Sequence, residues 1–93
     1  MLESRILIHD SGDLYYYMEF EKISNLYYPH FVAEYEDHSV KVALDLTIIE
    51  GELPDGKIYE VIQWAKTNNS ILQGMWGKLI KMKKNQINMR RAV

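Results

Sequence analysis

The sequence predicts a small α+β domain in which a mostly antiparallel β-sheet of about four strands, arranged as two hairpins, packs against a C-terminal pair of helices. Two observations predict this class. Apolar and polar residues alternate with a period of two in the first half of the chain, and they recur at helical spacing after Pro54. Because 93 residues can bury only one core, we expect a single domain over residues 1–93.

The first hairpin is predicted in RILIHDSGDLYYYMEFE, residues 5–21. Two runs rich in β-branched and aromatic residues flank Asp10–Asp13, a turn composition in which Gly12 can adopt a positive φ. The alternation in the second run predicts a core face made of Leu14, Tyr16, Met18 and Phe20. The opposite face then carries Tyr15, Tyr17, Glu19 and Glu21.

The second hairpin follows a predicted loop at residues 22–29. The runs HFVAEYE and VKVALDL flank a polar turn at residues 37–39, and the second run has a core face of Val40, Val42, Leu44 and Leu46. The stretch IIEGELPDG then closes the sheet, since Gly51 suits a bend. Pro54 cannot continue a central strand but can begin a helix.

Two amphipathic helices are predicted in the second half, and we expect them to cover one face of the sheet. The first has apolar residues at positions i, i+3, i+4 and i+7, which are Ile58, Val61, Ile62 and Ala65. After TNNS, a good capping composition, the same spacing recurs at Leu72, Met75, Trp76 and Leu79. The tail KKNQINMRRAV predicts a short edge strand through Ile87 and Met89.

The net charge of −2 conceals a strongly polarised chain. All 13 acidic residues lie at or before Glu60, where only four basic residues occur, so this part carries a balance of −9. The remaining 33 residues carry seven basic residues and no acidic one, a balance of +7. This asymmetry is the strongest global signal in the sequence and indicates charged partners or internal pairing.

Several chemistries are excluded or unsupported. With no Cys, the chain has no disulfide, thiolate zinc site or cysteine nucleophile. Neither familiar Gly-rich phosphate-binding motif occurs, and no Ser lies in a nucleophile-elbow context. No apolar run approaches a membrane span, and the N-terminus does not resemble a signal peptide. We therefore expect a prokaryotic cytoplasmic protein with no cofactor, metal site or membrane association.

The ordered residues of one segment resemble a known family. They are Pro29, His30, Phe31, Ala33, Tyr35, Gly51, Leu53, Pro54, Trp64 and Trp76, within a match from about Tyr15 to the end. The resemblance is to a small prokaryotic family called domain of unknown function number four-one-six-zero. It implies an α+β domain, often encoded beside a second small protein and sometimes labelled as part of a toxin–antitoxin pair. It implies no established reaction.

The chain departs from the family pattern at two positions. Tyr28 stands where the family has a first Pro, and Val32 stands where it has a second His. On a strand, residues i and i+2 share a face about 6.6 Å apart, so a His-x-His pair can converge on one metal or one phosphate. Val32 removes that option. For His30 two interpretations stay open: a general base or lone ligand, or a structural His bonded to backbone or to a carboxylate.

Two surfaces are predicted to bind partners. The acidic, Tyr-rich surface comprises Tyr15, Tyr17, Glu19, Glu21, Tyr27, Tyr28 and Glu34. Tyr is enriched in interfaces, although a covered second sheet face would make these residues core. The basic C-terminal segment carries Lys81, Lys83, Lys84, Arg90 and Arg91. It either binds nucleic acid, complements the acidic sheet of its own domain, or holds an acidic partner.

Our leading hypothesis is a non-catalytic module that binds another protein, expected to be encoded nearby, through the acidic Tyr-rich surface. Three observations support this hypothesis: the opposite charge of the two halves of the chain, the cluster of Tyr residues, and the lack of a recognisable set of catalytic residues. One alternative is a small ribonuclease-type toxin that uses His30 with a carboxylate and a basic residue such as Arg90. The other is an accessory protein that binds nucleic acid through the basic C-terminal segment.

Overall fold

The computed structural model describes residues 5–23 and 26–91, with the side chains at 22, 26, 27 and 82–91 outside the described set. Five strands form one antiparallel sheet in the order β1-β2-β5-β6-β7. They are β1 (Arg5–Asp10), β2 (Leu14–Glu19), β5 (His30–Tyr35), β6 (His38–Ala43) and β7 (Ile48–Gly51). The predicted α+β class and both predicted hairpins are confirmed, with one strand more in the sheet than expected.

A small ribbon occupies the segment that the sequence predicts to be a loop. Its strands are β3 (Lys22–Ile23) and β4 (Leu26–Tyr27), which pair with each other in a separate two-stranded sheet. Two-residue strands are too short to show a hydrophobic period, so the pattern rule could not find them. The ribbon connects the end of β2 to the start of β5.

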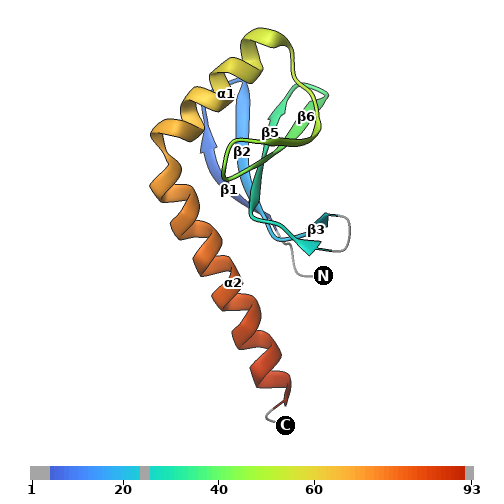
Figure 1. Cartoon of the computed structure of the whole chain (residues 1–93), viewed down its shortest axis with the longest axis vertical. Coiled ribbons are helices and arrows are strands. Elements are labelled where there is room, and N and C mark those ends of the chain that lie inside the picture. Colours follow the sequence, from blue (N-terminus) through green and yellow to red (C-terminus); the bar gives the residue numbers. More distant parts are fainter. Residues whose placement is uncertain (1–4, 24–25, 92–93) are drawn as a thin grey trace.

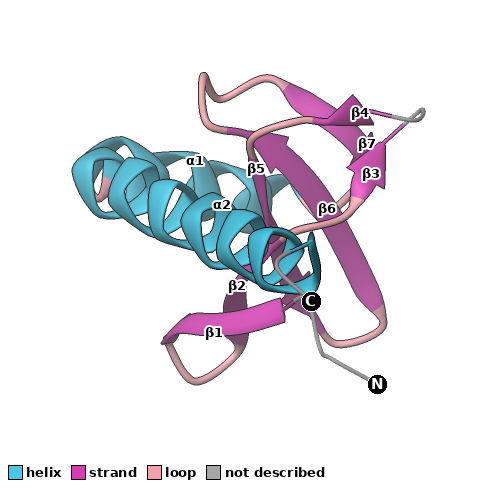
Figure 2. Ribbon diagram, turned by 90° about the horizontal axis from the view of Figure 1, so that it is seen from below, coloured by secondary structure: helices cyan, strands magenta, loops and turns pink. Residues whose placement is uncertain are grey.

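Two helices lie on one side of the five-stranded sheet (Figures 1 and 2). Pro54 precedes α1 (Asp55–Thr67), and Asn68 separates α1 from α2 (Asn69–Arg91). The Asn68 side chain donates a hydrogen bond to the carbonyl of Trp64 at 2.9 Å, and that of Asn69 donates one to the carbonyl of Leu44 at 3.2 Å. The two amides end one helix and fix the start of the next against the sheet.

The predicted C-terminal edge strand is wrong. Ile87 and Met89 lie in α2, which continues to Arg91. The stretch after Leu79 holds mostly Lys, Met, Gln, Arg and Ile, with no Gly or Pro, so nothing in it opposes a helix that has already started. Extending a helix costs much less than starting a new strand that has no partner alongside.

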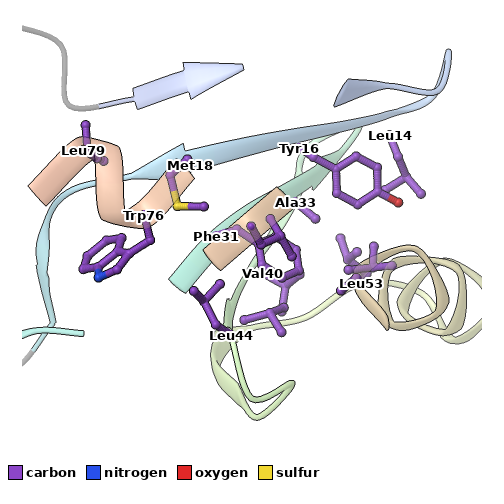
Figure 3. Packing of buried hydrophobic residues seen from close by; sticks show 14 residues of the cluster. Leu14, Tyr16, Met18, Phe31, Ala33, Val40, Leu44, Leu53, Trp76 and Leu79 are labelled. Carbon is purple, nitrogen blue, oxygen red and sulfur yellow. The ribbon is translucent and has the colours of Figure 1, made fainter. Parts of the chain in front are cut away.

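The core lies between the sheet and the helices (Figure 3). The predicted core face of β2 is confirmed, because Leu14, Tyr16 and Met18 are each at most 1% exposed. The Tyr16 ring stacks on Trp64 of α1 with a centroid separation of 4.0 Å. Burial raises the pKa of Tyr16 to about 12, with a smaller contribution from the charges of Glu60 and Asp13.

Gly51 is the one glycine whose conformation and surroundings both require the absence of a side chain. Its φ is +85°, and a Cβ at this position would collide with the backbone carbonyl oxygen of Ser39. Gly51 is therefore the position at which the end of β7 bends while its backbone lies directly against that of β6.

We expect Gly51→Ala to lower the free energy of unfolding by about 1–3 kcal/mol, because it adds both a clash and a disfavoured φ. The matched control is Gly74→Ala in the exposed part of α2, where a Cβ meets nothing within 4 Å. That change should stabilise by up to about 1 kcal/mol. Urea denaturation of the two variants checks the pair, and a Gly51→Ala protein as stable as wild type would contradict this view of the bend.

Candidate functional site

One face of the sheet is not covered by either helix, and we call it the open face. Because Met18, Phe31 and Val42 are buried in the core, their neighbours along each strand must lie on the opposite side. The register aligns these neighbours in a row across all five strands. The row is Leu7, Tyr17, Val32, Lys41 and Glu50.

A set of ion pairs, here called the charge network, crosses the same face. Its members are Arg5, Glu19, Glu21, His30, Glu34, Lys41 and Glu50. Glu19 lies at its centre and is only 4% exposed. Its Oε1 is 3.6 Å from Arg5 Nε, and its Oε2 is 2.8 Å from His30 Nε2 and 3.3 Å from Lys41 Nζ. Groups from three other strands thus converge on one buried carboxylate.

His30 is fully buried, and both of its ring nitrogens are engaged. Nδ1 lies 2.5 Å from the carbonyl oxygen of Tyr28, and Nε2 lies 2.8 Å from Glu19 Oε2. Both partners accept hydrogen bonds, so a ring with a proton on each nitrogen donates to both. The ring also lies 6.2 Å from the ring of Trp76 in α2. Neither nitrogen is left to act on a substrate, so the geometry is that of a structural histidine.

The charges around Glu19 outweigh its burial. Burial alone would raise the pKa of Glu19, but the hydrogen bond from His30 and the charge of Lys41 hold it below its ordinary value of 4.5. Burial would likewise lower the pKa of Lys41, yet Glu19 and Glu50 raise it above the ordinary value. Glu19 and Lys41 therefore both remain charged at neutral pH, which keeps the network intact.

The network extends to both edges of the sheet. At the β1 edge, the Arg5 guanidinium lies 4.5 Å from the centroid of the Tyr17 ring and donates to Glu34 Oε2 at 3.0 Å. At the β7 edge, Lys41 Nζ is 3.3 Å from Glu50 Oε1. Because every strand of the sheet supplies at least one member, the network fixes the outer strands to the centre.

The structure divides the predicted acidic, Tyr-rich surface. Tyr15 and Tyr17 lie on the open face, Tyr15 being 39% exposed, while Glu34 is half-buried there and Glu21 is exposed near Lys41. Glu19, predicted to contact a partner, is instead buried, because three basic side chains from neighbouring strands surround it. The side chain of Tyr27 lies outside the described residues.

Tyr28 belongs to a different surface. It is 44% exposed and lines an open pocket of about 220 Å³ together with Pro29, Ala43, Leu44, Asp45 and Gln73. The pocket lies where the start of β5 and the turn after β6 meet α2. Tyr15 pairs with Glu34 near the opposite end of β5, so the two tyrosines do not form one patch.

The remaining candidates lie apart from the charge network. His9 stacks on Trp64, and His38 lies beside Asp37. Lys81 is exposed on α2, and the side chains of Lys83, Lys84, Arg90 and Arg91 fall outside the described residues. In the part of the chain whose side chains are described, no three His, Asp or Glu residues are placed to hold a metal ion. Neither α1 nor α2 combines the length and the hydropathy of a membrane-spanning helix over its described residues.

Three members of the charge network, Arg5, Lys41 and Glu50, are not among the site residues that the sequence predicts. The usable signal is that alternation places each of them on the same sheet face as Glu19. Of the strands that carry them, only β1 is adjacent to β2, whereas β6 and β7 lie beyond β5. The strand order is needed to bring them together, and alternation within one strand does not supply it.

Comparison with known families identifies the chain. The family model "Domain of unknown function (DUF4160)" matches residues 14–77, more than half of the chain. The chain therefore belongs to this family, as the resemblance indicated. No curated protein and no solved structure shows a significant match. The matched segment contains Glu19, His30 and Lys41, whereas Arg5 and the basic end of α2 lie outside it.

We expect Glu19→Gln to lower the free energy of unfolding by about 1–3 kcal/mol, because it removes the charged acceptor from the buried His30 ring and leaves Arg5 and Lys41 with only their more exposed carboxylate partners. Glu50→Gln is the matched control, since Glu50 also pairs with Lys41 but its side chain is 59% exposed. It should change stability by no more than about 1 kcal/mol. Urea midpoints measure both, and equal effects would rule out a special role for Glu19.

Stability should also fall in acid. The pKa of Glu19 is lower in the folded state than its ordinary value of 4.5, so its contribution is complete above about pH 4.5 and is lost as pH falls toward the folded pKa. Asp13 and Asp45 also have lowered pKa values and act in the same direction. Urea midpoints measured downward from pH 6 should therefore decline less steeply in Glu19→Gln than in wild type. Parallel declines would exclude Glu19 as a source of the acid sensitivity.

Proposed function

We propose that this chain is a non-catalytic protein-binding module whose partner docks on the open face of the sheet. The observation that carries the proposal is the group of exposed large side chains on a face that neither helix covers. Leu7 is 53% exposed and Tyr15 is 39% exposed, on the adjacent strands β1 and β2. Side chains of this kind supply contact area when a partner excludes water from them.

The charge network supports the proposal by fixing the open face before binding. Tyr17 is held beneath Arg5, and Arg5 is held by Glu34, so these side chains lose little freedom when a partner arrives. The exposed acids Glu21 and Glu50 lie at the rim near Lys41. A basic partner surface would complement them and would be attracted over a distance.

The position of His30 weighs against the ribonuclease alternative. A general base must reach the proton that it removes, whereas His30 is 0% exposed and both ring nitrogens contact protein oxygens. The same contacts explain the presence of a histidine in this strand without any reaction.

We further propose that the partner is a small protein encoded nearby, in a cytoplasmic toxin–antitoxin or other conflict system. This part of the proposal rests on the resemblance alone, since the family to which the chain belongs is described only as a domain of unknown function. The open face sets the chemistry of the partner, which should present a basic, partly apolar surface.

The test begins with a tagged wild-type chain and a nuclease-treated lysate of the native host, from which a stoichiometric protein is identified and then purified. Its affinity is next measured for wild type, Tyr15→Asp and Tyr59→Asp. Tyr59 is 67% exposed on α1, on the helix side of the sheet, and is the matched control. We expect Tyr15→Asp to weaken binding at least about tenfold, as truncating an interface aromatic does, and Tyr59→Asp to leave it unchanged. Equal affinities for all three proteins would refute docking on the open face.

A further inference from the structure

Two basic side chains of α2, Lys78 and Lys81, pair with no carboxylate in the described part of the chain. This helix contains six Lys or Arg residues and no Asp or Glu. Elsewhere in the domain, Arg5 of β1, Lys41 of β6 and Lys57 of α1 each pair with a carboxylate. Lys78 and Lys81 of α2 are exposed, and neither forms an ion pair with a described side chain. The alternative in which the basic segment complements the acidic sheet of its own domain is therefore not supported by any ion pair of Lys81 with a described side chain.

The sequence of α2 changes character where the helix passes the core. Leu72, Trp76 and Leu79 are buried and follow helical spacing. The same register continues through Lys83, Gln86 and Arg90, so the apolar line ends after Leu79. About 12 further residues of helix, or about 18 Å, follow this point. Figure 1 shows this end of α2 extending past the sheet, in a molecule measuring 51 × 24 × 23 Å.

A projecting helix with only positive charge suits a polyanion. Duplex DNA carries one negative charge per about 1.7 Å of its axis, and its major groove is wide enough for an α-helix. Proteins that bind single strands usually stack bases on exposed aromatic side chains, whereas the one aromatic residue of α2, Trp76, is 7% exposed. The major groove of duplex RNA is too narrow to admit a helix. Lys83 and Arg90 interrupt the apolar face that a membrane-surface helix needs.

We propose that the C-terminal part of α2, from Lys78 onward, is an arm that binds the phosphate backbone of duplex DNA. The arm lies in the helix layer, and the acids of the charge network lie on the opposite face of the sheet, so they do not screen it at close range. This inference is independent of the protein-binding function proposed for the open face. The two would operate together if a DNA-bound chain also holds a protein.

The test uses the full chain and a fluorescent DNA duplex of about 20 bp, two helical turns, with anisotropy measured over a range of salt concentrations. The logarithm of the association constant should fall linearly with the logarithm of the salt concentration. Lys81→Gln should weaken binding severalfold and reduce the steepness of the plot by about 1, and Lys83→Gln with Lys84→Gln should reduce it by about 2. Lys66→Gln is the matched control, because Lys66 is exposed on α1 and lies outside the arm. It should leave the plot unchanged.

Three results would overturn the proposal: no binding of duplex DNA at low salt, equal effects of Lys66→Gln and Lys81→Gln, or tighter binding of a single strand, an RNA duplex or anionic phosphatidylserine vesicles. Circular dichroism of each variant confirms that the helices remain. Tyr15→Asp should bind DNA like wild type, so a failure here is separable from a failure of the protein-binding function.

Discussion

Glu19 places a carboxylate where water hardly reaches, and without counter-charges that position would cost several kcal/mol. Arg5 of β1 and Lys41 of β6 supply those counter-charges, and the buried His30 of β5 adds a hydrogen bond. These contacts form only when the three strands hold their observed register around β2. The contacts with Glu19 in turn disfavour any other strand register. A slip by one residue would turn Arg5, His30 or Lys41 to the core face, where it could not reach the Glu19 carboxylate. The network therefore specifies the register of the sheet as well as its open face.

This arrangement divides the domain into three parts with different physics. The helix side is stabilised by burial of apolar groups, with Tyr16, Phe31 and Trp64 in ring contact. The open face is held by ion pairs and hydrogen bonds, which leaves large side chains such as Leu7 available to a partner. On α2, Lys78 and Lys81 are exposed and form no ion pair with a described side chain. The polarity seen along the sequence thus becomes a separation in space between an acidic face and a basic arm.

The sequence predicts those parts of the fold in which the apolar residues of a single strand or helix recur at regular spacing. The core face of β2 follows from alternation alone, and the helix break at Asn68 follows from its capping composition. Glu19 was misplaced because alternation assigns a residue to a face, whereas burial depends on what the neighbouring strands bring to it. The tyrosines divided for a related reason, since Tyr15 and Tyr28 lie near opposite ends of paired strands. The tail was mistaken for a strand because Ile87 and Met89 also alternate over a short stretch.

The most direct test of this account is the ionisation of Glu19 itself, followed at its carboxyl carbon by NMR as the pH of the folded protein is lowered. If the hydrogen bond from His30 and the charge of Lys41 outweigh burial, the carboxyl group of Glu19 titrates below its ordinary value of 4.5. A titration at or above that value would mean that burial dominates and that the charge network does not hold the sheet.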